Sequence, residues 1–264
     1  MGVAQDYLPS NITLIFIMND TNFPSSNFFF LLGNLSILPE RILIISLIAI
    51  VVIDLLNKGK NTILLYRISL ISMSISAVAS LCQWVVPIAP GNPHISNFSN
   101  IFRFFLLICS LLSVLLSIDY IRCSKTALAE FLLFTLTAGL GGMVLCYAND
   151  LITIYVALEF ISLSSCFLSG YTKRDIRSNE ATTKFLPMGG TSSYFLLYGF
   201  SSLYGLSGGQ LQLDKIADGI SFSQYVVPTY ISAAFITAGT AFKSSLVPFH
   251  QWTPDVYEGV WFVQ

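Results

Sequence analysis

Long apolar runs separated by short polar connections dominate this chain from about residue 38 onward. A membrane-spanning helix needs ~17–25 consecutive, mainly apolar residues. The runs that meet this requirement are Pro39–Leu56, Ile63–Val86, Ile101–Ile118, Phe131–Tyr147, Leu151–Gly170, Ala181–Tyr204 and Pro228–Val247. No stretch alternates polar and apolar residues as a half-buried strand does. The pattern therefore predicts an all-α polytopic membrane protein with about seven transmembrane helices.

The N-terminal region differs from the rest of the chain. Its two apolar runs, Ile12–Met18 and Phe28–Leu32, are too short to cross a bilayer. We therefore assign residues 1–37 to an N-terminal extension, residues 38–118 to the first three transmembrane helices, and residues 119–264 to helices four to seven. A very short connection makes the fourth and fifth helices antiparallel neighbours. The polar stretch between the sixth and seventh helices predicts a short surface helix.

The composition narrows the possible functions. The chain is 54% hydrophobic and only 10% charged, whereas soluble chains carry ~25% charged residues. Its net charge is −1 and it has no basic patch with spaced aromatic residues, so we expect no nucleic-acid partner. The five cysteines lack metal-ligand spacing and are interpreted as small buried hydrophobes. Because no phosphate-loop, dinucleotide or zinc-protease motif occurs, we expect this chain to bind no cofactor or metal.

The distribution of positive charge predicts the topology. The connections after the first, third and fifth helices contain Lys58 and Lys60, Arg122 and Lys125, and Lys173, Arg174 and Arg177. The opposite side has only Arg41, Arg103 and Lys215. Lysine and arginine accumulate on the side from which a membrane protein inserts. We therefore place the odd-numbered connections on that side and the N-terminus on the other.

One acidic residue lies in the middle of the fifth predicted helix. Glu159 is ~12 Å along the axis from Leu151, which is near the middle of a ~30 Å hydrocarbon core. A carboxylate at this depth is costly, has no basic residue one helical turn away, and usually serves a function. Glu159 is thus a candidate for proton transfer, and Ser162, Ser164 and Ser165 are near enough to bridge to it. The alternative is a packing role, with a hydrogen bond to a neighbouring helix.

A lysine lies near the end of the seventh predicted helix. Lys243 has no acidic residue within four positions, and Pro248 soon afterwards breaks the helix. A charge beside a broken helix at membrane depth is typical of bundles that handle ions. Lys243 is therefore a second candidate, and His250, within the break, is a further one. We expect a hydrated pocket around Ser244 and Ser245 into which Lys243 points; the alternative is that its ammonium reaches the headgroups.

A second lysine, Lys184, lies near the start of the sixth predicted helix. Glu180, one turn earlier, offers it a local ion pair, so Lys184 is also consistent with an interfacial role. With Glu159 and Lys243 it makes one acid and two bases on three consecutive helices. Moving such groups together or apart changes their proton affinities. The pattern favours a proton relay in which Lys184 lies between the other two; Pro187 predicts a kink in the same helix, unless the helix tolerates it.

Four segments of the chain resemble one known family. They are ILPERILI, YVALEFISLSS, SNEATTKFLPMGGTSS and FKSSLVPFHQWTPDVYEG. They are similar to segments of the antiporter-like subunit 2 of respiratory complex I and of its plastid relative, the NAD(P)H–plastoquinone oxidoreductase. EFLLF, GGMVLCYANDLITIY and SGYTKRDIRSNEAT most resemble the chloroplast form. The similarity runs from about Leu38 to Phe262, although Pro187 and Trp261–Gln264 depart from the plastid pattern.

The resemblance implies a fourteen-helix fold with two inverted repeats. Residues 119–264 would form the first repeat, with a discontinuous seventh helix. Glu159, Lys184 and Lys243 would be its proton-relay residues. The second repeat would lie beyond Gln264, so the chain is interpreted as the N-terminal half of the family's fold, as a first-exon translation would give.

The resemblance also implies a function. The chain would be a proton-translocating subunit in the membrane arm of a chloroplast thylakoid enzyme, coupling electron transfer to quinone with proton movement. NAD(P)H, iron–sulfur clusters and plastoquinone would be bound by partner subunits, and this chain would contact other membrane-arm subunits and the lipid bilayer. Two alternatives remain: a subunit of a cation/proton antiporter, and a truncated membrane fragment that transports nothing.

Overall fold

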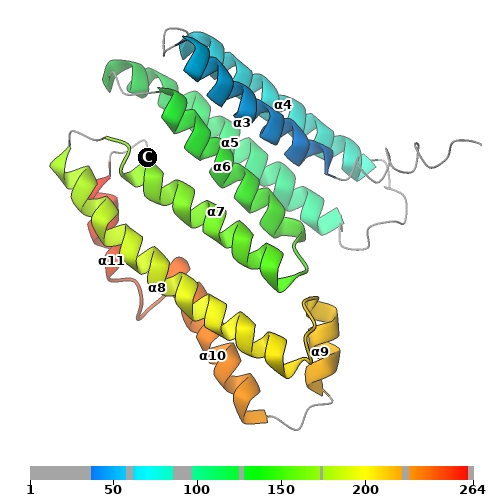
Figure 1. Cartoon of the computed structure of the whole chain (residues 1–264). Helices are drawn as coiled ribbons and strands as arrows, with labels where there is room; N and C mark the ends of the chain where they lie inside the picture. The colour runs from blue at the N-terminus through cyan, green and yellow to red at the C-terminus, as the bar shows by residue number, and fades with distance from the viewer. Residues whose placement is uncertain are drawn as a thin grey trace, which may run out of the picture.

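We analysed a computed structural model of the chain, which describes residues 37–57, 62–85, 97–124, 128–172, 175–221 and 226–260. All regular elements in these ranges are helices (Figure 1). They are α3 (Leu38–Asn57), α4 (Thr62–Val85), α5 (Asn97–Ser124), α6 (Leu128–Tyr147), α7 (Leu151–Ser169), α8 (Ile176–Leu206), α9 (Leu213–Ser221), α10 (Val226–Lys243) and α11 (Trp252–Gly259). The all-helical prediction is confirmed.

The predicted long helices correspond one by one to α3–α8 and α10. By length and composition alone, α4, α5, α6 and α7 can cross a membrane. The other three contain more charge or less apolar sequence. Glu40, Arg41 and Asp54 lie in α3, the first turns of α8 are polar, and α10 is short and ends at Lys243. Pro187 lies inside α8, which continues past it as one helix.

The helices α3, α4, α5 and α6 enclose the main apolar core. Its buried side chains include Leu43 and Ile50 of α3, Leu65 and Met73 of α4, Leu107 and Val114 of α5, and Leu132, Leu136 and Met143 of α6. On its other side α6 packs against α7, as the very short connection between them predicted. In Figure 1, α7 lies between this bundle and the pair formed by α8 and α10.

A buried ion pair joins α3 to α5 inside this bundle. The side chains of Glu40 and Arg103 are 2% and 0% exposed, and the Arg103 guanidinium donates to the Glu40 carboxylate. Arg103 also donates to Asn100 Oδ1 at 3.3 Å, and its guanidinium carbon lies 4.5 Å from the ring centroid of Tyr147 in α6. Arg103, interpreted from the sequence as a charge on one face of the membrane, is therefore a buried contact between helices.

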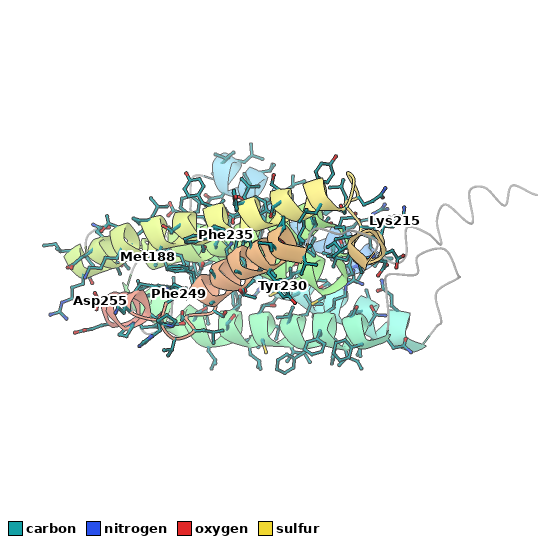
Figure 2. All side chains as sticks on the ribbon, turned by 90° about the horizontal axis from the view of Figure 1, so that it is seen from below. Met188, Lys215, Tyr230, Phe235, Phe249 and Asp255 are labelled. Atoms are coloured by element: carbon teal, nitrogen blue, oxygen red, sulfur yellow. The ribbon has the colours of Figure 1, made fainter. Side chains whose placement is uncertain are left out.

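Small residues let α8 and α10 pack closely. A Cβ atom at Gly199 of α8 would come within 2.5 Å of Ile236 Cγ1, and one at Gly239 of α10 within 2.6 Å of Leu196 Cγ. Glycines at such contacts allow the backbones of membrane helices to approach each other. Phe235 of α10 lies at the same interface (Figure 2). The two helices therefore form one packed unit.

The predicted surface helix between the sixth and seventh long helices is α9. The loop before it is attached to the turn between α6 and α7. Leu151 N donates to Leu211 O at 3.1 Å, Leu213 N donates to Asn149 O at 3.0 Å, and Asn149 Nδ2 donates to Asp214 Oδ2 at 3.1 Å. This end of α7 is thereby tied to the segment that follows α8.

Part of the topology prediction concerns residues outside the described ranges. Lys58, Lys60, Lys125, Lys173 and Arg174 lie there, as do residues 1–36 and 261–264, and the side chain of Arg122 is likewise outside them. The orientation of the chain in the membrane stays a prediction from its sequence.

Candidate functional site

The candidate site is built around a break in the last long helix. α10 ends at Lys243 and α11 begins at Trp252, so the discontinuous helix expected from the sequence is present. The break opens before Pro248: Ser245 has a left-handed backbone, with φ at 55°. Backbone bonds persist through the turn, with Leu246 N donating to Ala241 O at 2.9 Å and Phe249 N to Leu246 O at 2.7 Å.

Lys243 and Glu159 form an ion pair across two helices. Lys243 Nζ, at the end of α10, lies 2.8 Å from Glu159 Oε1 on α7. It also donates to the carbonyl oxygen of Leu158 at 3.2 Å. The side chains are 15% and 25% exposed, so both are largely enclosed. The structure thus brings together two candidates that are 84 residues apart in the sequence.

A hydroxyl from a third helix contacts the same carboxylate. Ser193 Oγ on α8 lies 2.5 Å from Glu159 Oε1. The serines that were expected to bridge to Glu159 instead donate to carbonyls of their own helix: Ser162 to Glu159 O, Ser164 to Phe160 O and Ile161 O, and Ser165 to Ile161 O and Ser162 O. Because contacts between α7 and α8 depend on how the helices pack, the sequence of α7 gave no indication of Ser193.

Lys184 forms a separate group of charges. Its Nζ lies 3.0 Å from Glu180 Oε1 on the same helix and 3.0 Å from Asp255 Oδ2 on α11. The side chains of Lys184 and Asp255 are 45% and 56% exposed. The expected pair with Glu180 is present, but Lys184 does not lie between Glu159 and Lys243, which contact each other directly. Asp255 is not among the candidates from the sequence, so its contact with Lys184 was missed.

His250 lies in the break and is exposed. Its backbone carbonyl accepts from Thr253 N at 3.1 Å, next to the start of α11. The structure therefore places His250 in the connection to α11.

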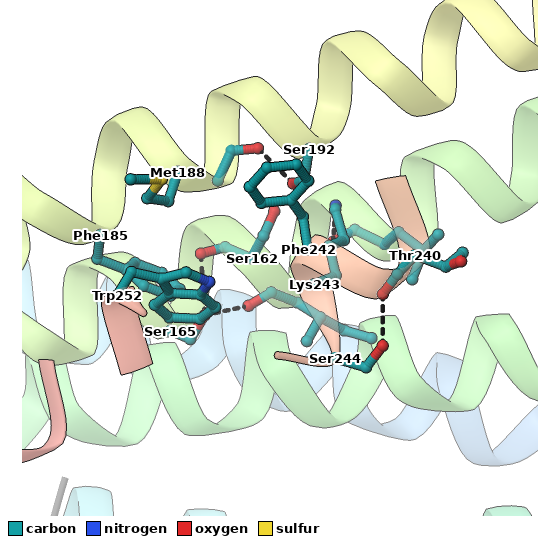
Figure 3. A pocket seen from close by; sticks show the side chains of 13 residues that line it. Ser162, Ser165, Phe185, Met188, Ser192, Thr240, Phe242, Lys243, Ser244 and Trp252 are labelled. Atoms are coloured by element: carbon teal, nitrogen blue, oxygen red, sulfur yellow. Dashed lines mark hydrogen bonds between the residues drawn. The ribbon is translucent and has the colours of Figure 1, made fainter. Parts of the chain in front are cut away.

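A cavity of about 340 Å³ lies beside Lys243 of the ion pair; its lining side chains are shown in Figure 3. Helices α7, α8 and α10, the break and α11 all contribute to its wall. The lining residues are Leu158, Ile161, Ser162, Ser165, Phe185, Met188, Gly189, Ser192, Thr240, Phe242, Lys243, Ser244 and Trp252. A pocket was expected here, with Lys243 and Ser244 on its wall; Ser245 is not among the lining residues. Within the described ranges, no group of three or more His, Cys, Asp or Glu side chains is placed to hold a metal ion.

The arrangement resembles that of known membrane proteins. Residues 23–119 match the family model for the N-terminal region of NAD(P)H-quinone oxidoreductase subunit 2. Residues 148–262 match the model for the transmembrane region of NADH:quinone oxidoreductases and Mrp antiporters. The second match contains all four candidate residues, Glu159, Lys184, Lys243 and His250.

Solved structures share the fold. A chain of respiratory complex I from Thermus thermophilus, solved with bound aureothin, is 27% identical with a TM-score of 0.68, and the match covers 84% of this chain and 47% of that one. A chain of the archaeal membrane-bound sulfane sulfur reductase is 21% identical with a TM-score of 0.73, covering 87% and 48%. A chain of the Mrp complex from Dietzia sp. DQ12-45-1b is 16% identical with a TM-score of 0.65, covering 84% and 44%. The last two show the fold alone.

The present chain spans about half the length of these matched chains. Its fold is that of the antiporter-like subunits in the membrane arm of complex I. In chain order, the chain is similar first to the N-terminal region of NAD(P)H-quinone oxidoreductase subunit 2 and then to the membrane region shared by NADH:quinone oxidoreductases and Mrp antiporters.

Proposed function

We propose that this chain is a proton-translocating subunit in the membrane arm of a complex I-like NAD(P)H:plastoquinone oxidoreductase of the thylakoid membrane. The observation that carries the proposal is the contact between Lys243 Nζ and Glu159 Oε1 at 2.8 Å beside a broken helix. The match to NAD(P)H-quinone oxidoreductase subunit 2 supports the assignment to the enzyme. The chloroplast-like segments of the sequence support the plastid form.

The ion pair supplies the proton chemistry. While the two groups are in contact, the opposite charges stabilise each other. Separating them removes this mutual stabilisation, and burial then favours the neutral form of each. A conformational change that opens the contact therefore moves two protons in opposite senses, one leaving Lys243 and one joining Glu159, and closing the contact reverses both transfers.

A second ion pair, between Lys184 and Asp255, lies on the other side of the break in the helix. Lys243 connects the end of α10 to α7, whereas Asp255 connects α11 to α8 through Lys184. The break lies between these two connections. We assign Lys184 to the proton path on the α11 side, separate from the Glu159–Lys243 pair, and we keep His250, in the connection between the two helices, as a further candidate.

In this proposal the redox cofactors belong to other subunits. NAD(P)H and plastoquinone react on partner chains that also hold iron–sulfur clusters, and other membrane-arm subunits contact this chain within the bilayer. The chain itself contributes the charged groups that move protons.

A second candidate function is that of a subunit in a cation/proton antiporter. The family model that matches residues 148–262 includes Mrp antiporters. The two functions differ in what drives the proton: electron transfer to quinone in the first, and a counter-moving cation in the second. Proton transfer that requires Na⁺ but not NAD(P)H would favour the antiporter. If neither Na⁺ nor NAD(P)H supports proton transfer, the chain is a membrane fragment that transports nothing.

The substitution Glu159→Gln tests the proposal. It keeps the size of the side chain and removes the charge that Lys243 contacts. We expect the complex to assemble and NAD(P)H-driven proton uptake into vesicles to fall by at least about tenfold, equivalent to ~1.4 kcal/mol. Proton uptake is read with a pH-sensitive dye, and assembly by native electrophoresis.

Asp218→Asn is the matched control. Asp218 lies exposed on α9, and its substitution likewise turns a carboxylate into an amide, outside both charged groups. We expect this variant to transport at the parent rate. If the Glu159→Gln complex assembles and also transports at the parent rate, Glu159 serves helix packing and not proton transfer.

A further inference from the structure

Ser193 of α8 contacts Glu159, and the proposed proton chemistry leaves this contact without a role. The residue is buried, and its Oγ lies 2.5 Å from Glu159 Oε1. A hydroxyl that donates to a carboxylate makes bonds of ~2.5–2.7 Å, which are roughly twice as strong as bonds between neutral groups. Lys243 Nζ meets the same oxygen at 2.8 Å. Ser193 and Lys243 therefore bind one atom of Glu159 from two different helices.

The Ser193 hydroxyl has a second acceptor within reach. Its Oγ lies 2.9 Å from the carbonyl oxygen of Gly189, four residues earlier on α8. A serine hydroxyl has one hydrogen and two lone pairs, and it rotates to suit its partners. That carbonyl oxygen also accepts from Ser192 Oγ at 2.6 Å. The single hydrogen of Ser193 therefore points to Glu159 Oε1 while that oxygen carries negative charge, because the carbonyl has another donor.

This geometry lets Ser193 stay bound to Glu159 with or without a proton on the carboxyl group. The hydroxyl donates to Oε1 when that oxygen is bare. When Oε1 bears the proton, the hydroxyl accepts from it and turns its own hydrogen to the Gly189 carbonyl. An ammonium group has donors and no lone pair, so Lys243 cannot accept from a protonated carboxyl group in this way. Ser193 therefore suits both forms of Glu159.

The backbone of α7 beside Glu159 is held by a neighbouring helix. A Cβ atom at Gly141 of α6 would lie 3.0 Å from Ile161 Cγ1 and 3.1 Å from the carbonyl oxygen of Ala157. Helix α6 thus packs closely on α7 both before and after Glu159. Lys243, in contrast, is the last residue of α10, where the break begins. The two members of the ion pair are therefore not equally constrained.

We propose that Ser193 is a positioning residue for Glu159. It keeps the carboxyl group bound to α8 in both protonation states, so that Glu159 stays in place when its contact with Lys243 opens. No proton passes through Ser193, because its own hydrogen only changes acceptor. The part of Ser193 in transport rests on the proposed function, whereas its bond to Glu159 rests on geometry alone. The two are therefore tested separately.

Infrared spectroscopy tests the bond when Lys243 is absent. The starting variant is Lys243→Met in the full 264-residue chain, reconstituted in phosphatidylcholine nanodiscs. Of the two side chains described in contact with the Glu159 carboxyl group, only Ser193 then remains. Spectra at neutral and acid pH give the carboxylate and carboxylic-acid bands, and the bands of Glu159 are those that Glu159→Gln removes. Ser193→Ala is then added to the starting variant.

Ser202→Ala is the matched control, because it removes a hydroxyl from the same helix. Ser202 Oγ donates to the carbonyl oxygen of Gly199, three residues earlier on α8, at 2.8 Å. We expect Ser193→Ala to shift both Glu159 bands, and Ser202→Ala to shift neither. The carboxylic-acid band should move to higher frequency, because a carboxyl group that loses a hydrogen bond has a stiffer C=O bond.

Two infrared results would overturn the proposal. If Ser193→Ala shifts neither band, Ser193 does not hold the carboxyl group once Lys243 is gone. If it shifts the carboxylate band alone, Ser193 releases Glu159 when the carboxyl group takes up a proton, and the contact does not persist in both states.

Proton uptake by the complete complex tests the part of Ser193 in transport. Ser193→Ala keeps Glu159 and Lys243, and alanine favours the helix, so we expect the complex to assemble. Uptake should fall by about fivefold, equivalent to ~1 kcal/mol, and Ser202→Ala should leave the rate unchanged. If Glu159→Gln lowers uptake and Ser193→Ala does not, Ser193 has no positioning role and the proposed function stands. If Glu159→Gln transports at the parent rate, the proposed function fails, and the infrared bands still decide whether Ser193 holds Glu159.

Discussion

Single side chains decide what the candidate site can do. Glu159 accepts from Lys243 on α10 and from Ser193 on α8, so one carboxylate joins three helices. Neither partner lies within one helical turn of Glu159 in the sequence. The depth of Glu159 in an apolar helix made it a candidate, because an isolated carboxylate there is costly. The identity of its partners depended on packing between helices, which local sequence does not contain.

The two substitutions Lys243→Met and Lys243→Arg separate charge from proton release. Methionine fills a similar volume without a proton to transfer, so we expect NAD(P)H-driven proton uptake to fall to background. Arginine keeps the charge and the pairing with Glu159 but holds its proton at any accessible pH. We expect uptake in Lys243→Arg to fall by about tenfold or more, equivalent to ~1.4 kcal/mol.

Lys215→Met is the control for these variants. Lys215 is exposed on α9 (Figure 2), and its loss should leave the rate unchanged. Full activity in Lys243→Arg would show that release of the Lys243 proton is not part of the cycle, and parent-like uptake in Lys243→Met would remove Lys243 from the proton path.

At the level of helices, the close contact between α8 and α10 holds the site in register. Gly199 and Gly239 let the helices approach, and this approach sets where Ser193 and Lys243 stand relative to α7. The lengths of the apolar runs predicted the long helices and their approximate limits. Their pairing did not, because a glycine in an apolar run indicates a possible close contact without naming the opposite helix.

Gly239→Ala tests this contact. The added methyl group would lie 2.6 Å from Leu196 Cγ and 3.0 Å from the carbonyl oxygen of Ser192. Since backbone cannot move aside as a side chain can, we expect a destabilisation of ~1–3 kcal/mol, measured by SDS-induced unfolding in lipid–detergent micelles. Gly205→Ala on α8 is the control, because a Cβ there meets nothing within 4 Å, and it should be neutral or stabilising. Equal stability of both variants would mean that α8 and α10 are not closely packed.

At the level of the whole molecule, the all-helical fold, the broken helix and the surface helix α9 could be predicted from the sequence. The buried Glu40–Arg103 pair could not be predicted, although the sequence shows both charged residues near the ends of apolar runs. Charges near the ends of apolar runs usually face the headgroups, and only the packing of α3 against α5 and α6 encloses these two. The same limit applies to Lys184, whose partner Asp255 lies on α11.

Removing one partner of the Glu40–Arg103 pair should destabilise the fold more than removing both. Arg103→Met leaves the Glu40 carboxylate enclosed without its partner, which for a buried pair costs ~3–5 kcal/mol. Replacing both residues by methionine leaves no charge and fills the space, so we expect stability within ~1 kcal/mol of the parent or above it. SDS-induced unfolding of the parent, both single variants and the double variant measures this difference. A double variant as unstable as Arg103→Met would contradict the expectation.

The same pair has a consequence for how the chain is made. Glu40 leaves the ribosome 63 residues before Arg103, so α3 reaches the bilayer with a carboxylate whose partner has not yet been synthesised. Only when α5 has entered beside it can the two charges neutralise each other. We therefore expect the first three long helices to enter the lipid together, with α3 staying close to the insertion machinery until α5 is complete.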